Sequence, residues 1–277
     1  MPLEYEAIRK SFNKAAPHYQ KNAVLQKEVL RRLLERLNDE AQLDNAFSPT
    51  EILDLGCGTG WAIETLHQQF PQAQITAVDF AQNMLDQIKP QPYLKTLLHD
   101  IHQLPFADAS MDVVFSNMVM HWCNESDVFS ECLRLLKPGG LLIMSSLGET
   151  SLVELKQAWL AVDKSVHVHD FPALHSMGDA LMQKGFQQVV VNAEIITLTY
   201  ADIVALMKDI KASGGHNCLE SRKKSLMVSK QLEDLKKAYE IFREDNKVPA
   251  SYEIVYLRAK KATESADKRA SLSLNIT

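Results

Sequence analysis

The residues whose types and spacing point most directly to chemistry lie in a glycine-rich loop in the first third of the chain. Asp54 lies near the end of an apolar run, three alternating glycines follow at Gly56, Gly58 and Gly60, and Asp79 ends the next apolar run. Glycines let a backbone turn sharply and approach a ligand, and a helix that follows directs free N–H groups at the same point. An acidic residue after the second strand is well placed for a ribose. The pattern predicts a site for a nucleoside-bearing cofactor.

The residue after the third glycine separates two classes of cofactor. The dinucleotide fingerprint G-x-G-x-x-G requires glycine where this chain has Trp61, and the glycine comes one position early, at Gly60. A bulky indole here argues against a bound pyrophosphate. The pattern resembles motif I of the class I S-adenosylmethionine-dependent methyltransferases, whose cofactor carries an adenosine and an amino acid but no phosphate. A glycine-rich turn with only a structural role is the alternative.

The elements that position this loop alternate between strands and helices. An amphipathic helix over residues 20–38 precedes them, and the turn residues 137–140 are expected to stop one helix and start the next strand. Alternation of this kind implies right-handed crossovers and a parallel sheet. The expected strands are 52–55, 74–79, 94–99, 112–117, 141–145, 186–199 and 251–257, with helices near 61–70, 81–88, 127–136, 151–163 and 174–184.

The domain organisation follows from these elements. Too many residues separate the last two strands for a plain connection, so we expect a helical cap inserted between them. The polar tail rich in small residues is expected to be disordered. The predicted parts are an N-terminal helical lid (1–44), a cofactor-binding core (45–200 and 251–260), the cap (201–250) and the tail (261–277).

Composition narrows the functional classes. The chain has 277 residues, of which 46% are hydrophobic and 23% charged, and its net charge of −5 gives no support to a protein that coats nucleic acid. The N-terminus lacks the apolar core of a signal peptide and no run is long enough for a membrane span, so we expect a cytoplasmic protein. Four scattered cysteines without C-x-x-C pairing fit reduced thiols. The nearby His167, His169 and His175 fit no strong zinc pattern, so we expect no metal.

Polar residues fall at the carboxyl ends of successive predicted strands, where open α/β sheets bind ligands. By resemblance to the methyltransferases, Asp79 binds the ribose hydroxyls, Asp100 the adenine amino group and Ile101 an adenine face, while Asp54 lies near the methionine ammonium. As structural alternatives, Asp79 caps the following helix and Asp100 stabilises a turn. The full set of expected cofactor-binding residues is Asp54, Gly56, Cys57, Gly58, Gly60, Asp79, Phe80, Met84, Asp100, Ile101 and Asn117.

Four further segments restrict the resemblance to one group of methyltransferases. Together with the core, residues 12–19, 117–123, 148–159 and 207–215 resemble the malonyl-[acyl-carrier protein] O-methyltransferases of biotin synthesis, over about residues 8–258. This resemblance implies an α/β, Rossmann-like class I methyltransferase fold with a seven-stranded, mostly parallel sheet whose last strand is antiparallel. It also implies transfer of a methyl group from S-adenosylmethionine to the free malonyl carboxylate.

A carboxylate needs no general base, so catalysis requires alignment and exclusion of water. The expected helpers are Tyr19, folding over the cofactor from the N-terminal helix, and His121 and Trp122 beyond strand four. A buried structural histidine and a core tryptophan are the alternatives for the last two.

The cap carries a local excess of positive charge. Carrier proteins present an acidic helix, so a basic rim would steer malonyl-acyl carrier protein to the site; an ordinary solvated helix face is the alternative. The expected carrier-protein residues are Lys208, Lys211, Arg222, Lys223 and Lys224. Two other functions stay open: methylation of another small-molecule acid or a quinone-like metabolite, and a non-catalytic module that binds S-adenosylmethionine.

Overall fold

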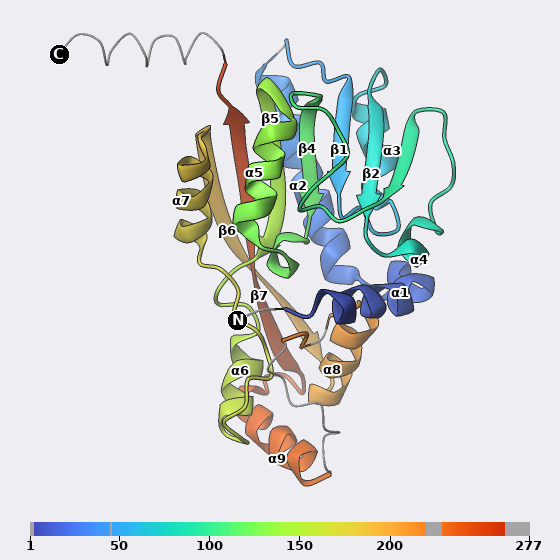
Figure 1. The fold of residues 1–277 in the computed structure, drawn as a ribbon. Coiled ribbons are helices and arrows are strands. Elements are labelled where there is room, and N and C mark those ends of the chain that lie inside the picture. Colours follow the sequence, from blue (N-terminus) through green and yellow to red (C-terminus); the bar gives the residue numbers. More distant parts are fainter. Residues whose placement is uncertain (1–2, 45, 216, 220–228, 264–277) are drawn as a thin grey trace, which may run out of the picture.

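The computed structural model describes residues 3–44, 46–215, 217–219 and 229–263. Within these residues the strands form one seven-stranded sheet with the order β3-β2-β1-β4-β5-β7-β6 (Figure 1). Neighbouring strands from β3 to β5 pair in parallel, whereas β7 is antiparallel to both β5 and β6. The predicted α/β fold with an antiparallel last strand is confirmed. The strands are β1 (Glu51–Leu55), β2 (Gln74–Asp79), β3 (Leu94–Leu98), β4 (Met111–Asn117), β5 (Leu136–Leu147), β6 (Phe186–Tyr200) and β7 (Val248–Lys261).

Helices cover both faces of the sheet because successive strand side chains point to opposite sides. Ile52 packs with α2 and α3 on one face, and the adjacent Leu53 packs with α5 and α7 on the other. None of the described helices is both long and apolar enough to cross a membrane. The helices are α1 (Tyr5–Asn22), α2 (Val24–Leu43), α3 (Trp61–Gln69), α4 (Gln82–Leu85), α5 (Glu125–Leu135), α6 (Val153–Leu160), α7 (Leu174–Lys184), α8 (Ile203–Ala212) and α9 (Ser229–Tyr239), with the 3-10 turns η1 (Met120–Trp122) and η2 (Glu240–Phe242).

One predicted boundary is wrong. Residues 137–140 do not separate a helix from a strand, because β5 begins at Leu136, directly after α5, and runs through them. The register changes from Met111 opposite Leu136 to Val113 opposite Leu141, so the extra residues form an irregular bulge. Gly139 has φ +79° within it. The turn chemistry of Lys-Pro-Gly-Gly is therefore used inside the strand and not before it.

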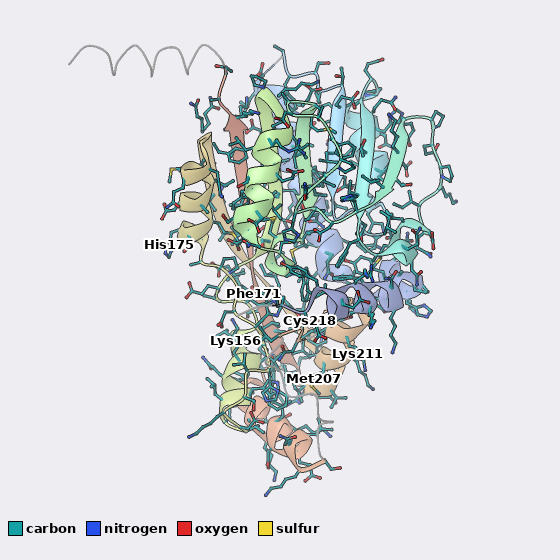
Figure 2. The ribbon with its side chains drawn as sticks, in the orientation of Figure 1. Lys156, Phe171, His175, Met207, Lys211 and Cys218 are labelled. Atoms are coloured by element: carbon teal, nitrogen blue, oxygen red, sulfur yellow. The ribbon has the colours of Figure 1, made fainter. Side chains whose placement is uncertain are left out.

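The last two strands extend past the rest of the sheet. The pairing of β5 with β7 ends at Leu147 opposite Ile254, whereas β6 and β7 continue to Tyr200 opposite Val248. This extension carries α6, α8 and α9, and side chains such as Lys156 and Met207 lie around it (Figures 1 and 2). The described residues of the predicted cap thus form α8, α9 and η2 and the first residues of β7.

Helix α1 connects the core to the cap. On the core side, the backbone N–H of Asn83 in α4 donates to Asn13 Oδ1 over 2.8 Å. On the cap side, Ser11 Oγ donates to the Gly214 carbonyl over 2.8 Å, and the Glu4 N–H donates to the Cys218 carbonyl over 2.8 Å. These contacts hold α1 across the carboxyl ends of the strands, where the predicted site residues lie.

Candidate active site

The glycine loop follows β1 and packs against the ends of two neighbouring strands. Gly56 has φ +66°, and a Cβ there would lie 2.3 Å from Val119 Cγ2. Gly58 has φ +54°, and its N–H donates to Asp79 Oδ2 over 2.9 Å. Positive φ favours glycine, and the contact with Val119 leaves no room for a side chain. These positions therefore need glycine for the chain to turn at the edge of the sheet.

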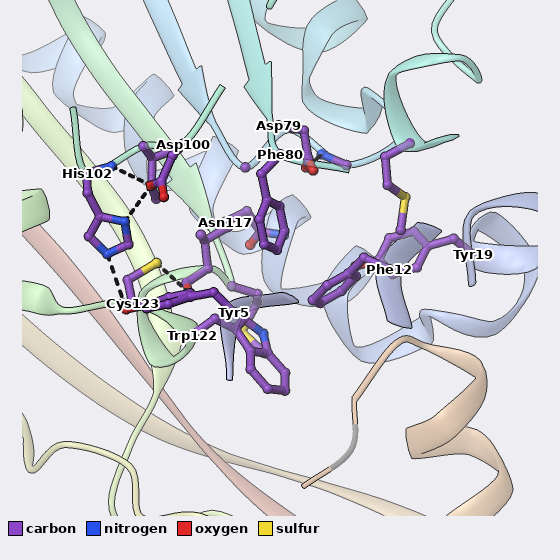
Figure 3. Close-up of a pocket in the computed structure, with 16 residues that line it drawn as sticks. Tyr5, Phe12, Tyr19, Asp79, Phe80, Asp100, His102, Asn117, Trp122 and Cys123 are labelled. Carbon is purple, nitrogen blue, oxygen red and sulfur yellow. Dashed lines mark hydrogen bonds and ion pairs between the residues drawn. The ribbon is translucent and has the colours of Figure 1, made fainter. Parts of the chain in front are cut away.

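A cavity lies over this loop. Figure 3 shows Asp79, Asp100 and Asn117 around it, with Phe12 and Tyr19 of α1 to the right of the view. Of the expected cofactor-binding residues, the structure gathers Gly56, Gly58, Asp79, Phe80, Met84, Asp100, Ile101 and Asn117 in the lining, together with Tyr5, Phe12, Tyr19, His102, Met118, Val119, Trp122 and Cys123. Three expected residues, Asp54, Cys57 and Gly60, do not line the cavity.

Two buried carboxyl groups lie beside the loop. Asp54 is 2% exposed, and its Oδ2 has no hydrogen-bond partner in the described part of the chain. Burial, and next the charge of Asp79, raise the pKa of Asp54 to about 7. Burial also raises the pKa of Asp79, to about 6, against the opposing effect of backbone hydrogen bonds. An unpaired buried carboxylate beside a bare glycine backbone fits the ammonium of an amino-acid moiety.

Asp79 lines the cavity, and its carboxylate also accepts two backbone hydrogen bonds. Its Oδ1 accepts the Ala81 N–H over 2.9 Å, at the residue that precedes α4. Its Oδ2 accepts the Gly58 N–H. Asp79 thus ties the glycine loop to the residue before α4, but it does not cap that helix, because Ala81 is the N-cap and no side chain among the described residues caps α4.

A histidine that sequence reasoning missed lies beside Asp100. The His102 N–H donates to Asp100 Oδ1 over 2.9 Å, and His102 Nδ1 also bonds to this oxygen. The Asn124 N–H donates to His102 Nε2 over 3.1 Å, so the proton of the imidazole is on Nδ1. His102 therefore orients the carboxyl group of Asp100 in the cavity wall. In the sequence, the one feature that could have indicated His102 as a site residue was its position two residues after Asp100.

Strand β4 ends in a turn that directs the next residues toward the cap. Met118 has φ +59°, which is uncommon for a residue with a side chain, and its N–H donates to Ser145 Oγ over 3.0 Å. Ser145 Oγ in turn donates to Asn117 Oδ1 over 2.8 Å, and Asn117 Nδ2 donates to the Gln26 carbonyl over 3.1 Å. The turn therefore fixes η1, which carries His121 and Trp122, against α2 and β5.

A second cavity lies between this turn and the cap. The predicted catalytic residues Tyr19, His121 and Trp122 all line it. Its lining is mostly apolar, and four of its residues also line the first cavity: Phe12, Tyr19, Met118 and Trp122. Two adjoining cavities can hold a group donor and a group acceptor side by side, so that the group passes from one to the other where the cavities meet.

The shared wall is aromatic. Tyr19 stacks on Trp61 with ring centroids 5.4 Å apart, and Phe12 meets Trp122 edge to face at 5.8 Å. Burial, with a smaller effect from Asp79, raises the pKa of Tyr19 well above its usual range, so its phenol stays protonated. Trp61, the residue that replaces the dinucleotide glycine, is thus a platform for α1 and lies outside the cavity lining.

The chain is similar to known methyltransferases along most of its length. Residues 53–144 match the family model described as a methyltransferase domain. The chain is 41% identical to the malonyl-[acyl-carrier protein] O-methyltransferase of Methylovorus sp. (strain MP688), over 94% of this chain and 90% of that protein. It belongs to the malonyl-[acyl-carrier protein] O-methyltransferase family. It is also 36% identical to the biotin biosynthesis bifunctional protein BioHC of Teredinibacter turnerae, over 94% of this chain and 47% of that protein.

The fold agrees with this family. It is similar to a putative methyltransferase from Bacillus halodurans, with a TM-score of 0.57 and 18% identity, over 83% of this chain and 99% of that structure. The family, the glycine loop and the cavity above it identify the cofactor as S-adenosylmethionine. The protein is an S-adenosylmethionine-dependent O-methyltransferase.

The expected carrier-protein residues of this methyltransferase are only partly described. Lys208 and Lys211 are exposed on α8 and do not line the second cavity, and Figure 2 shows Lys211 on the same helix as Met207. Arg222, Lys223 and Lys224 lie outside the described residues. No comparison tests the role of any of the five, which stays a prediction.

The three histidines considered for a metal do not form a common cluster. His167 Nε2 bonds to Asp163 Oδ1 over 2.9 Å, and its ring stacks on Trp159 with centroids 3.5 Å apart. His169 lines the second cavity, and His175 is exposed on α7. Among the described residues, no group of three or more His, Cys, Asp or Glu side chains is arranged to hold a metal ion.

Proposed function

We propose that the protein transfers the methyl group of S-adenosylmethionine to the free carboxylate of malonyl-[acyl-carrier protein], forming the methyl ester as an early step of biotin synthesis. The observation that carries this proposal is the pair of cavities that meet at one aromatic wall. The first fits an adenosine and an amino acid. The second is mostly apolar, which suits an acyl group on a flexible arm. The names of the similar proteins supply the substrate.

The chemistry requires little of the protein beyond positioning. When bound, the cofactor supplies an electrophilic methyl group on a positively charged sulfur. The O–C bond to the malonyl carboxylate forms as the C–S bond breaks, and the electron pair of that bond stays on sulfur. A carboxylate is already ionised near neutral pH, so no side chain has to remove a proton. The tasks left are to align the reacting oxygen with the methyl–sulfur bond and to keep water out.

The shared aromatic wall can perform both tasks. We infer that Tyr19 and Trp122 set the orientation of the malonyl group beside the methyl donor, because both line the two cavities. Phe12 closes the wall from α1 against Trp122 and excludes water. Because Tyr19 stays protonated, its phenol is available as a hydrogen-bond donor and not as a base.

The cofactor contacts follow from the first cavity. We assign the ribose hydroxyls to Asp79, the adenine amino group to Asp100 and an adenine face to Ile101, each of which lines the cavity. We assign the ammonium to Asp54, which lies behind the glycine loop and outside the cavity lining, because its Oδ2 is buried without a hydrogen-bond partner among the described residues. Phe80, Met84 and Asn117 complete the lining.

Recognition of the carrier protein is proposed for the basic residues of the cap. Lys208 and Lys211 are exposed on α8, in a protein whose net charge is −5. A local positive surface on an acidic protein steers an acidic partner by complementary potential. Arg222, Lys223 and Lys224 belong to the same proposal, as does a cytoplasmic location.

The test is a mass measurement on the carrier protein. Purified protein is incubated with S-adenosylmethionine and malonyl-carrier protein, and the product should gain the mass of one methyl group in place of a hydrogen. Acetyl-carrier protein, which has no free carboxylate, should gain none. No gain on the malonyl form would refute the proposal. Equal turnover of free malonate or malonyl-coenzyme A would favour a small-molecule methyltransferase.

A further inference from the structure

The second cavity has an unexpected set of charges for a site that receives an anion. Of its described lining residues, none is a lysine or an arginine, and Asp209 is the one carboxylate. Asp209 Oδ2 accepts the Tyr200 hydroxyl over 2.7 Å. Lys156 lies near but outside the lining, where its ammonium donates to the Glu149 carbonyl over 3.1 Å (Figure 2). The usual ion pair between a bound carboxylate and a guanidinium is absent from the described part of this wall.

The cavity does contain a buried imidazole with one unpaired ring nitrogen. His121 is 8% exposed, and its Nδ1 has no hydrogen-bond partner among the described residues. Its ring packs 5.1 Å from Trp122, which belongs to the wall shared with the cofactor cavity. A buried polar nitrogen without a partner costs about 1–3 kcal/mol, and a ligand that bonds to His121 Nδ1 in this cavity would recover that free energy.

A second buried histidine packs beside this one. His169 is 7% exposed, and its Nε2 also has no hydrogen-bond partner among the described residues. Its ring centroid lies 5.2 Å from Trp122 and 4.7 Å from Phe171, and the His121 ring packs against the same two side chains. This shared packing joins the segment after α6 to η1. Nothing in the sequence pattern pairs these two residues.

Both rings are neutral near pH 7. Burial, and then the nearby His169, lower the pKa of His121 to about 3. Burial, and then the charge of Lys156, lower the pKa of His169 to about 4. A neutral imidazole still offers one N–H donor, which can orient one oxygen of a carboxylate and leave the other free to react.

The reaction itself explains why a neutral partner suits this site. Methyl transfer from a sulfonium to a carboxylate removes one positive and one negative charge. A weakly polar cavity strengthens the attraction between these two charges before they disappear. A guanidinium beside the carboxylate would occupy its lone pairs and would remain as a buried, unpaired charge next to the neutral ester.

We propose that the malonyl carboxylate is bound by the neutral imidazole of His121, which packs beside His169, and that the sulfonium of the bound cofactor supplies the counter-charge that no lysine or arginine in the described part of the cavity wall provides. This inference rests on the proposed function and names the group that recognises the acid.

The first test needs no variant. Binding of malonyl-carrier protein is measured by calorimetry on enzyme saturated either with S-adenosylhomocysteine, which is neutral at sulfur, or with the cofactor analogue that carries an ammonium in place of the methylsulfonium. We expect the malonyl form to bind roughly tenfold or more tightly beside the charged analogue. Acetyl-carrier protein should bind both enzyme forms equally. Equal affinity of the malonyl form for both would overturn the proposal and would indicate a cation from the protein.

The second test separates hydrogen bonding from packing at His121. His121→Asn keeps a donor without the ring, and His121→Phe keeps a ring without the donor. We expect His121→Phe to weaken binding of malonyl-carrier protein by roughly 10- to 100-fold and His121→Asn by much less, with the affinity for S-adenosylhomocysteine unchanged in both. The opposite order would make His121 a packing residue. His169→Ala should raise KM with little change in cofactor affinity, because it removes a ring that packs with His121 against Trp122 and Phe171.

The two proposals fail separately. If the malonyl-carrier protein gains no methyl group, the proposed function is wrong. If it is methylated but binds with equal affinity beside the neutral and charged cofactor forms, only the assignment of the carboxylate is wrong.

Discussion

The buried carboxyl group of Asp54 predicts a trade-off between stability and cofactor binding. Its pKa rises from 3.8 to about 7 in the folded protein, mainly through burial. The folded protein binds the proton of Asp54 more tightly than the unfolded chain does. The contribution of Asp54 to the free energy of unfolding is therefore greatest below pH 4, and it is lost as the pH rises toward 7. One pKa unit corresponds to about 1.36 kcal/mol, so the full loss is about 4 kcal/mol at most.

Replacing Asp54 with asparagine removes this loss while keeping the shape of the side chain. Without cofactor, we expect Asp54→Asn to raise the free energy of unfolding by about 2–4 kcal/mol at pH 8, and by less than half as much at pH 5, where the wild-type carboxyl is largely protonated. Urea denaturation at the two pH values measures both quantities. The same change should weaken binding of S-adenosylmethionine roughly 10- to 100-fold, because the ammonium loses a charged acceptor.

A matched control is Asp86→Asn, at an exposed position directly after α4 whose carboxylate accepts Gln82 Nε2 over 2.7 Å. This change should alter the free energy of unfolding by about 0.5 kcal/mol or less at either pH. A lower stability of Asp54→Asn than of the wild type at pH 8 would refute the reasoning, because it would show that the carboxylate has a stabilising partner. An equal gain at both pH values would show that ionisation of Asp54 is not the cause.

Three further outcomes follow from the site. Gly56→Ala places a Cβ 2.3 Å from Val119 Cγ2 at φ +66°, so we expect a loss of about 2–4 kcal/mol in the free energy of unfolding, measured by urea denaturation; a loss below 1 kcal/mol would mean that the loop relaxes easily. Tyr19→Ala opens the wall between the two cavities and should lower kcat about 10- to 100-fold. Tyr19→Phe keeps the ring, so it should retain most of the cofactor affinity. Equal effects of the two changes in steady-state kinetics would exclude a role for the ring. Lys208→Glu combined with Lys211→Glu should raise KM for malonyl-carrier protein several-fold at low salt and less at high salt, without changing cofactor affinity; a KM independent of salt would argue against docking on α8.

The sequence predicted those features that depend on neighbouring residues. Alternation of apolar runs with amphipathic segments indicates the α/β class because strand and helix periods differ, and the glycine loop followed by Trp61 indicates the cofactor because the residue types needed at a tight turn are local. It was less accurate where tertiary packing competes with local chemistry. Residues 137–140 form a bulge inside β5, because the strand continues along β4 through a turn-forming sequence.

The tertiary structure alone decided where the substrate goes. Ser11 and Gly214 meet although 203 positions separate them, and this contact helps α1 close over both cavities. Neither the wall of Phe12, Tyr19 and Trp122 nor the packing of His121 and His169 against Trp122 follows from any local pattern.

The acid–base properties of the site were also decided by the tertiary structure. A pKa depends on burial and on neighbouring charges, so the raised pKa of Asp54 and the lowered pKa of His121 exist only once distant segments enclose these groups. The sequence by itself determined the fold class and the cofactor, because both depend on short-range spacing. The acyl cavity and the groups that face it were decided by the packing of α1, η1 and the cap, because contacts between residues far apart in the chain leave no local signature.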